Sequence, residues 1–359
     1  MQKDFHYYCI GVLAKAAGFS SKDALTIAYA SQYVDDATEG TQIPVNAPNN
    51  IRIDPVRTAH KGLMWLLGAK WSEQKKVYIP FHFIPPLFYE PPGWGFGFIT
   101  KPGSDFAKML LKEACKGKKE CKCWEPMIRD FKLFRLCRIG IALHTYADTW
   151  AHQDFSGRND TENEVKGIYI YKKNKDKPSF QINLRKALPC TGHAEAGKLP
   201  DRAFLKWGYH SISHVDNSPR LNAEVFTEAA ESIHRELSKV EKPKPESPNI
   251  PWEKIKEKIF EQFQYEGKDV DDRCDKWREF FINMFDDLDD HNKFKYNEED
   301  WRKTALDTPK EEDYNWEDFS KTDRRWNRFT LKKEYFLSPF YHFHRAALLQ
   351  RHFVLERLP

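Results

Sequence analysis

Apolar residues recur every three to four positions along most of the chain, which is the spacing of a helix with one buried face. The segments that show this spacing most clearly are 5–17, 23–39, 54–68, 126–152 and 221–239. Alternating apolar positions, the mark of a strand, are plausible only in GIYIYKK and SFQINL, within residues 160–190. The pattern therefore predicts a mostly α fold.

Two segments interrupt the helical pattern. Residues 76–100 carry five prolines and many aromatic residues without a helical period, so we expect a long loop or short extended pieces. Residues 239–251 are proline-rich and charged, which is typical of a linker. The chain is therefore expected to divide into a helical domain over 1–240 and a charged helical region over 252–359, whose last helix (338–356) packs back on the core.

Charge and composition exclude several classes of protein. The balance of 57 Lys+Arg against 53 Asp+Glu leaves a net charge of +4, which is no general argument for nucleic-acid or membrane affinity. No apolar run is long enough for a transmembrane segment, and the start MQKDFHYY lacks the basic and apolar parts of a signal peptide. The seven cysteines form no disulfide framework. We expect a protein without a transmembrane segment that is cytoplasmic, or exported without a general secretory signal peptide.

The motif HTYADTWAH places three metal-type ligands on the strongest helix. His144, Asp148 and His152 are spaced i, i+4 and i+8, so they drift only about 80° around the helix axis and face one way. The two histidines are about 12 Å apart along the axis, too far to share one ion easily, whereas adjacent pairs are close enough. Asp148, with two carboxylate oxygens, is then placed to bridge two ions.

Residues that can bind metals also occur on the other expected helices. They are His6, Asp35, Asp36 and His60, together with His193 in the loop GHAEAGKLPD. Each alone would be an ordinary histidine or helix-end acid. Together with HTYADTWAH they fit a polynuclear metal site.

The order of these residues resembles a known superfamily. An early His, an Asp on the second helix, a His on the third, then H-x-x-x-D with a following His and a downstream His resemble the zinc-dependent phospholipase C and single-strand nuclease superfamily. The stretches DFHYY, SQYVDDATE, ALHTYADTWAHQDFSG, GHAEAGKLPD and FHRAALLQRHFVLERLP look more like a bacterial family of unassigned function within it. The resemblance covers about residues 1–215 and implies a multi-helix, phospholipase C-like bundle.

The resemblance also implies two zinc ions, or three, and their ligands. The implied ligand sets are Asp36, His60, His144 and Asp148 for one zinc, His6 and Asp148 for a second, and His152 and His193 for a third. The catalytic role falls to Asp148, Asp36 and His144. The possible further ligands are Asp4, Asp35, Glu195 and Asp201.

Three of these further ligands stand at the two places where the sequence departs from the superfamily pattern. There, the mature amino terminus itself binds zinc, whereas here five residues precede His6, so either Asp4 substitutes or that metal is missing. The third site normally takes a His followed four residues later by a carboxylate, and here the candidates after His193 are Glu195 and Asp201.

The expected chemistry is hydrolysis of a phosphodiester by hydroxide that the metal ions supply. No covalent nucleophile is needed, and the sequence has no G-x-S-x-G, while Ser156 lacks the setting of a nucleophile elbow. In the segment FHFIPPLFYEPPGWGFGF, Trp94 and Phe96 are candidates for binding acyl chains or nucleobases. Arg158 is a candidate for binding phosphate.

We therefore expect a zinc-dependent, phospholipase C-like hydrolase of phosphodiesters. Phospholipid is favoured because the net charge of +4 is small for a protein that follows a polyanion. A single-strand nuclease or another phosphodiesterase remains the alternative among enzymes. From a different class, a binding protein with a structural metal cluster fits the same ligands.

Overall fold

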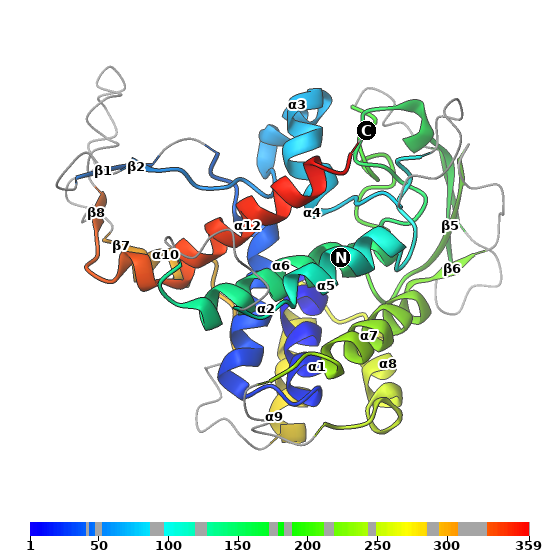
Figure 1. Cartoon of the computed structure of the whole chain (residues 1–359). Helices are drawn as coiled ribbons and strands as arrows, with labels where there is room; N and C mark the ends of the chain where they lie inside the picture. Colours follow the sequence, from blue (N-terminus) through cyan, green and yellow to red (C-terminus); the bar gives the residue numbers. More distant parts are fainter. Residues whose placement is uncertain are drawn as a thin grey trace.

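The computed structural model describes residues 1–40, 43–46, 52–86, 97–118, 128–171, 179–182, 189–211, 219–242, 249–285, 294–307 and 329–358. Most of them are helical, which confirms the prediction of a mostly α fold. The longer helices are α1 (Ile10–Ala16), α2 (Ser21–Asp36), α5 (Asp105–Ala114), α6 (Phe131–Ala151), α7 (Asn222–Ser238), α8 (Lys256–Gln264), α9 (Val270–Phe285) and α12 (Pro339–Leu355) (Figure 1). The shorter helical pieces are η1 (Asp4–Cys9), η3 (Gly62–Ala69), α3 (Trp71–Glu73), η4 (Gln74–Tyr78), α4 (Ile79–Phe81), η7 (Thr161–Asn163), η8 (Trp252–Lys254), α10 (Asp300–Ala305) and η11 (Tyr335–Leu337).

The capping residues explain where the main helices begin. The Ser20 hydroxyl accepts a hydrogen bond from the Asp23 amide at 3.1 Å and starts α2. The Asp130 carboxylate does the same for the Leu133 amide at 3.0 Å and starts α6. Ser338 caps α12. These three helices lie within a few residues of their predicted ranges.

The centre of the molecule is α6, which packs against α2, α5, α7 and α12. Gly140 allows the closest of these contacts, because a Cβ atom there would lie 2.4 Å from the carbonyl oxygen of Ile27 on α2. Gly140 lies one turn before His144, so α2 passes close to the polar part of α6. The glycine thereby places the end of α2 beside the candidate site.

One apolar core includes helices from both sides of the expected linker. The Phe5 ring of η1 lies 5.6 Å, centroid to centroid, from both Phe226 of α7 and Phe263 of α8. The amide of Ile250 donates to the carbonyl oxygen of Ala16 at 2.8 Å. Residues 243–248 lie outside the described part. Among the described residues, the C-terminal region therefore shares its core with the N-terminal helices.

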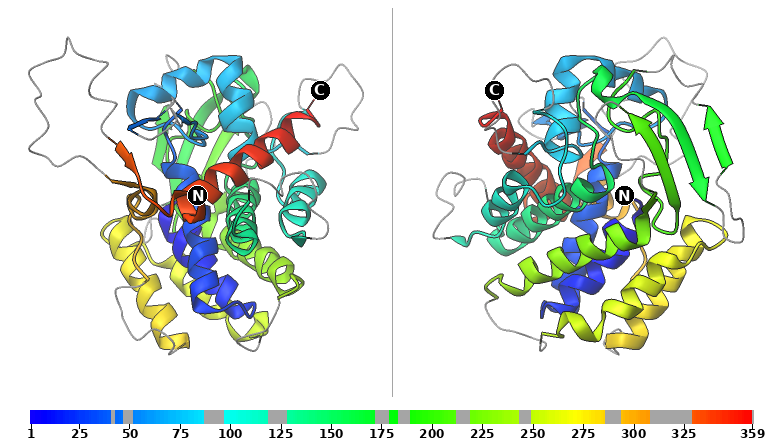
Figure 2. Two further views of the ribbon diagram at one scale, coloured as in Figure 1. Left: turned by 60° about the vertical axis from the view of Figure 1, so that its left-hand side comes forward. Right: turned by 90° about the vertical axis from the view of Figure 1, so that its right-hand side faces the viewer.

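Two small sheets flank the helices. The first is antiparallel, with strand order β4 (Ser179–Ile182), β3 (Val165–Tyr171), β5 (Lys206–Ser211) and β6 (Arg220–Leu221) (Figure 2). The second has the order β2 (Arg52–Ile53), β1 (Ile43–Asn46), β8 (Phe329–Leu331) and β7 (Leu306–Asp307). Strands β3 and β4 lie where they were predicted. The expectation of strands only within 160–190 was wrong. Strand β5 has six residues with Trp207 and Tyr209 buried in alternation, and the remaining strands have only two to four residues, too few to show a pattern.

The helix expected over 54–68 is also wrong in its first half. The amide of Val56 donates to Nδ1 of His344 at 3.0 Å, and the amide of Thr58 donates to the carbonyl oxygen of Ala37 at 2.8 Å. Because these donors bind distant parts of the chain, they are not available for a helix ladder. Helical turns begin only at η3.

The start of the expected 76–100 loop is helical instead. Elements η4 and α4 continue the helical backbone through Phe81. Pro80 lies at the end of this helical stretch, in α4, which directly follows the π-helical segment η4. Residues 87–96 lie outside the described part. Across the described residues, we find no helix with the length and apolar character needed to cross a membrane.

Candidate metal centre

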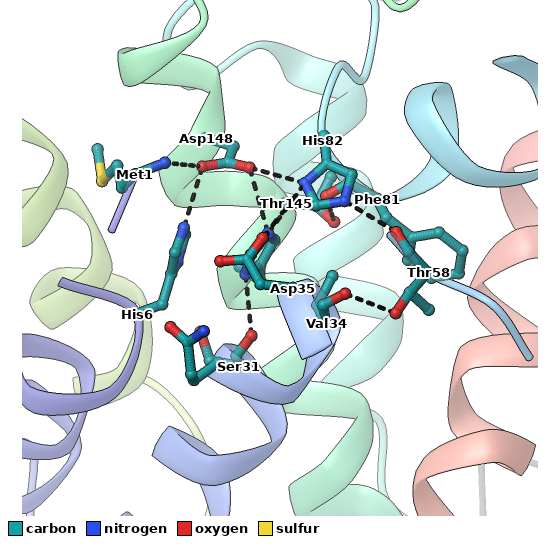
Figure 3. A network of polar contacts seen from close by, with 12 residues as sticks. Met1, His6, Ser31, Val34, Asp35, Thr58, Phe81, His82, Thr145 and Asp148 are labelled. Carbon is teal, nitrogen blue, oxygen red and sulfur yellow. Dashed lines mark hydrogen bonds and ion pairs between the residues drawn. The ribbon is translucent and has the colours of Figure 1, made fainter. Parts of the chain in front are cut away.

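Asp148 lies at the centre of a buried polar cluster, and its side chain is 1% exposed. One carboxylate oxygen, Oδ1, is 2.7 Å from the amino group of Met1 and 3.2 Å from Nε2 of His6. The other, Oδ2, is 3.2 Å from Nε2 of His144 and 3.3 Å from Nδ1 of His82 (Figure 3). Both oxygens of this one carboxylate therefore have several polar neighbours, as a bridging ligand would.

Three groups of ligand-type atoms surround this carboxylate, and within each group the atoms lie within 4.8 Å of one another. Among the described residues, the groups are Asp35, His82 and His144; His6, His144 and Asp148; and His152, His193 and Asp201. Since His144 belongs to two groups and His152 follows α6 directly, helix α6 connects all three.

Backbone carbonyl groups orient four of the five histidines. A carbonyl oxygen accepts one ring N–H of each, so the other ring nitrogen presents a lone pair to the cluster when the ring is neutral. The pairs are His82 Nε2 with Thr58 at 2.8 Å, His144 Nδ1 with Ser31 at 2.9 Å, His152 Nδ1 with His82 at 2.9 Å and His193 Nδ1 with Gly197 at 2.8 Å. This is how proteins commonly orient histidines that bind a metal.

Two of these lone pairs face each other. Nδ1 of His82 is 3.2 Å from Nε2 of His144, although the other nitrogen of each ring already donates to a carbonyl group. A proton or a metal ion between the two nitrogens is needed to relieve this repulsion. Two ligands on one tetrahedral zinc are about 3.3 Å apart, given zinc–nitrogen distances of about 2.0–2.1 Å.

His6 fits a metal ligand for a different reason. Its ring is fully buried and stacks on the His144 ring, with centroids 3.8 Å apart. Neither ring nitrogen makes a hydrogen bond of normal geometry, and Nε2 has only the Asp148 carboxylate oxygen at 3.2 Å beside it. An unpartnered buried polar atom is costly, and an ion beside Asp148 would remove that cost.

The protonation states of Asp148, His152 and His6 at neutral pH also suit metal binding. Burial raises a carboxyl pKa, but neighbouring histidines and the amino group of Met1 hold the pKa of Asp148 well below its usual range. Burial lowers the pKa of His152 to about 4 and that of His6 well below its ordinary value. The carboxylate is therefore ionised and these two imidazoles are neutral, which is the state in which such groups bind metals.

The charges in the cluster are unequal. The carboxylates of Asp35, Asp148 and Asp201 outnumber the amino group of Met1. Burial lowers the pKa of that amino group, but the three carboxylates, Asp148 most strongly, outweigh burial and raise it to about 11. Excess negative charge in a buried site favours the binding of cations.

Two residues of the predicted first zinc site lie outside these groups. The Asp36 carboxylate accepts a hydrogen bond from Tyr296 at 2.5 Å and pairs with Lys61 at 2.7 Å. Nε2 of His60 is 3.1 Å from the Glu73 carboxylate, and its ring stacks on Tyr78. His60 still lines the cavity described below, but it does not share a ligand group with His144.

Their places are taken by Asp35 and His82. Asp35 lies one residue earlier on α2, and a step of one residue turns a side chain by about 100° around a helix. Sequence reasoning missed His82, although it is the only histidine between His60 and His144. It was counted as part of a proline-rich loop, in which no spacing indicates direction.

Of the four further candidates, the structure places Asp35 and Asp201 in the ligand groups and Asp4 and Glu195 outside them. Asp4 forms an ion pair with Arg273 at 2.6 Å, and the Met1 amino group lies beside Asp148 instead. Glu195 accepts a hydrogen bond from the Val165 amide at 2.8 Å, whereas Asp201 joins the third group.

The cluster opens into a cavity of about 1260 Å³. The described residues on its wall include Asp35, His82, Asp148, His152 and His193 from the cluster. The cavity also has the basic residues Lys61, Lys198 and Arg202 and the apolar residues Tyr78, Phe83, Ile168 and Leu199. A substrate in this cavity would touch both the cluster and an apolar wall.

The predicted substrate-binding residues are elsewhere or outside the described part. Arg158 pairs with Asp160 at 2.5 Å and lies over the Phe98 ring. It lines a separate hollow of about 490 Å³ beside Trp71. Trp94 and Phe96 lie outside the described residues.

One protein-family model matches residues 1–358, and its description is a family of unknown function (DUF6765). The match covers almost the whole chain, so the chain belongs to this family. No curated protein and no solved structure gives a significant match.

Proposed function

We propose that this chain, as a member of the DUF6765 family, is a metal-dependent hydrolase of phosphodiesters that uses zinc. The observation that carries this proposal is the set of carbonyl-oriented histidines beside two carboxylates. The free ring nitrogens of His82 and His144 face Asp148, and the free ring nitrogen of His152 faces Asp201. Imidazole and carboxylate together suit zinc among the common divalent ions. The open cavity beside them favours catalysis over a closed structural site.

The three ligand groups would hold up to three ions. Bound divalent ions activate water and neutralise the charge that develops on phosphoryl oxygens. The chain itself contributes the positions of the ligands. The carbonyl groups of Thr58 and His82 fix the His82 and His152 rings on the cavity wall, and the carbonyl group of Ser31 fixes the buried His144 ring. Lys198 and Arg202 are exposed on its wall and form no ion pair within the described part, so they attract an anionic substrate.

The residues around the cavity also favour a reaction without a covalent intermediate. No serine or cysteine is on the wall among the described residues, and the Thr191 hydroxyl donates to the carbonyl oxygen of Gly68 at 3.3 Å. Ser156 is fully buried and does not line the cavity. Among the described residues, the cavity wall thus offers the substrate metal ligands and cations but no activated serine or cysteine.

The arrangement of helices is proposed to be phospholipase C-like. The support is the order of the clustered residues along the chain: His6, Asp35, His82, His144, Asp148, His152, His193 and Asp201. This order keeps the pattern of the zinc-dependent phospholipase C and single-strand nuclease superfamily, with Asp35 and His82 in two of its places. Phospholipid is the favoured substrate because Tyr78, Phe83 and Ile168 give the cavity an apolar side.

The test combines elemental analysis with a panel of substrates. We expect the purified protein to hold about two or more divalent ions per chain and to cleave phosphatidylcholine in vesicles better than single-stranded DNA. A preparation with less than about one ion per chain that takes up none on addition of zinc would overturn the proposal. Bound metal with no cleavage of lipid, DNA or a small phosphodiester would support a structural cluster instead. Cleavage of DNA alone, falling steeply with salt, would identify a nuclease.

A further inference from the structure

We infer that the helical tip formed by η3 and α3 docks on a lipid surface that carries anionic headgroups. Only four large apolar side chains are exposed among the described residues, and two of them, Leu66 and Trp71, lie in this tip. They are 47% and 45% exposed. Figure 1 shows α3 at the outer edge of the molecule. The inference rests on the proposed function only for why the protein would meet a lipid.

Two large apolar side chains of the tip are exposed close together in the sequence. Leu66 lies in the 3-10 helix η3, and Trp71 is the first residue of α3. An exposed leucine and an exposed tryptophan are costly in water but are typical of a segment that lies at a membrane interface. Leu66 and Trp71 therefore need an apolar surface to cover them.

The tip is held firmly from inside, so the exposure of these side chains is a property of the fold. The buried amide of Gln74 donates to the carbonyl oxygens of Gly68 and Ala69, at 2.8 and 3.2 Å. A Cβ atom at Gly68 would lie 2.9 Å from the Tyr78 ring, so only glycine allows η3 to approach η4 this closely.

The charges around the tip favour an anionic surface. Lys70 and Lys76 are exposed and have no ion pair within the described part. The Lys75 ammonium group lies 5.4 Å from the centre of the Trp71 ring. Glu73 is the only acid between Lys61 and Lys76, and it already pairs with Arg57 and His60. Apolar residues flanked by unpaired lysines bind anionic lipids by insertion and charge together.

The position of the tip connects docking with the cavity. The segment begins directly after Lys61 and ends before Tyr78, and both residues line the cavity wall. A protein docked through Leu66 and Trp71 would therefore hold this wall next to the lipid headgroups. The phosphodiester of a phospholipid lies at that depth. We favour lipid over a protein partner because a neutral, apolar protein surface would offer the exposed lysines no opposite charge. Anionic headgroups would offer one.

The test is co-sedimentation with vesicles of phosphatidylcholine alone or with roughly 30% phosphatidylserine. We expect the parent to sediment with the anionic vesicles. The double variant Leu66→Gln/Trp71→Gln should lower the bound fraction at least about fivefold, because the inserted apolar area is lost. Lys70→Gln/Lys76→Gln should lower binding to the anionic vesicles and leave the weak binding to phosphatidylcholine unchanged.

The matched control is Leu337→Gln. Leu337 is 50% exposed, as large as Leu66, and lies in η11 away from the tip. Its variant should bind like the parent, and thermal unfolding checks that each variant is folded. Equal binding by the Leu66/Trp71 variant and the parent, or loss of binding only in Leu337→Gln, would overturn the inference. A parent that ignores anionic vesicles but forms dimers lost in the tip variant would show a protein partner instead.

Sedimentation needs no turnover, so the two proposals fail separately. A protein that binds anionic vesicles through the tip but cleaves no phosphodiester keeps the docking surface and loses the proposed function. A protein that cleaves a small soluble phosphodiester but binds no vesicle keeps the function and loses the docking surface.

Discussion

Helix α6 and the segment over residues 54–86 supply histidines to the same cluster in different ways. On α6, the spacing of His144 and Asp148 fixes their common face. In the segment, the sequence analysis chose His60 and missed His82, but only His82 enters a ligand group, because the Thr58 carbonyl oxygen orients its ring. In a regular helix, the sequence spacing therefore predicts which way a side chain points. In an irregular segment, tertiary hydrogen bonds decide the direction.

The largest effect is expected from the centre of α6. Asp148→Asn should release most of the metal, because this carboxylate lies next to ligand atoms of every group. Turnover of a soluble phosphodiester should fall by more than about 100-fold, since metal ions contribute several kcal/mol to charge stabilisation. Elemental analysis and the rate of phosphodiester cleavage measure the two losses.

The control is Asp130→Asn on the same helix. Asp130 caps the start of α6 and has no role in the cluster, so this variant should lose about 1 kcal/mol of stability and keep its metal. If the two variants lost metal equally, the release would reflect a weakened helix and not a lost ligand.

The sharpest test of the comparison lies in the irregular segment. His82→Ala should weaken metal binding by at least about tenfold, because its Nδ1 faces Asp148 and His144. His60→Ala should keep the metal, since that ring pairs with Glu73. Competition with a coloured zinc chelator measures both affinities. Metal loss from the His60 variant with none from the His82 variant would reverse the assignment.

The same contrast explains how much was predictable from the sequence. The mostly α fold and the range of α6 follow from periodicity, and the pairing of His6 with Asp148 is what the resemblance to the superfamily implied. The choice of His82 over His60 does not, because residues 54–61 bind distant partners instead of forming a helix. The resemblance named the amino terminus as a ligand, but the five residues before His6 led us to expect Asp4 in its place or no metal, whereas the Met1 amino group lies 2.7 Å from Asp148.

A smaller effect is expected where two acids compete at the end of α2. Asp35→Asn should weaken the ion shared with His82 and His144, whereas Asp36→Asn should leave metal content unchanged. Asp36 contacts Tyr296 and Lys61, so its variant should cost only about 1–2 kcal/mol of stability. Zinc titration and urea unfolding separate these outcomes. Equal zinc affinity in the two variants would remove Asp35 from the cluster.

The smallest expected effect concerns the bond that holds the irregular segment in place. Nδ1 of His344 accepts the Val56 amide, so this ring must be neutral. Burial, helped by Arg345 and Arg351, lowers the pKa of His344 to about 3, against an ordinary value near 6.5. Below pH 6.5 the unfolded chain therefore takes up a proton that the folded chain refuses. The stability from neutral His344 is present above pH 6.5 and is lost as the pH falls toward 3.

The loss should amount to about 1.4 kcal/mol per pH unit, or about 2 kcal/mol between pH 7 and pH 5. His344→Gln keeps an acceptor for Val56 but does not titrate. Between pH 7 and pH 5, the free energy of unfolding of this variant should therefore fall by about 2 kcal/mol less than that of the parent. Urea unfolding at the two pH values measures the difference. His352→Gln is the control, since His352 is exposed on the same helix and its variant should follow the parent. Parallel pH profiles for the parent and His344→Gln would show that His344 does not hold residues 54–61 in place by this bond.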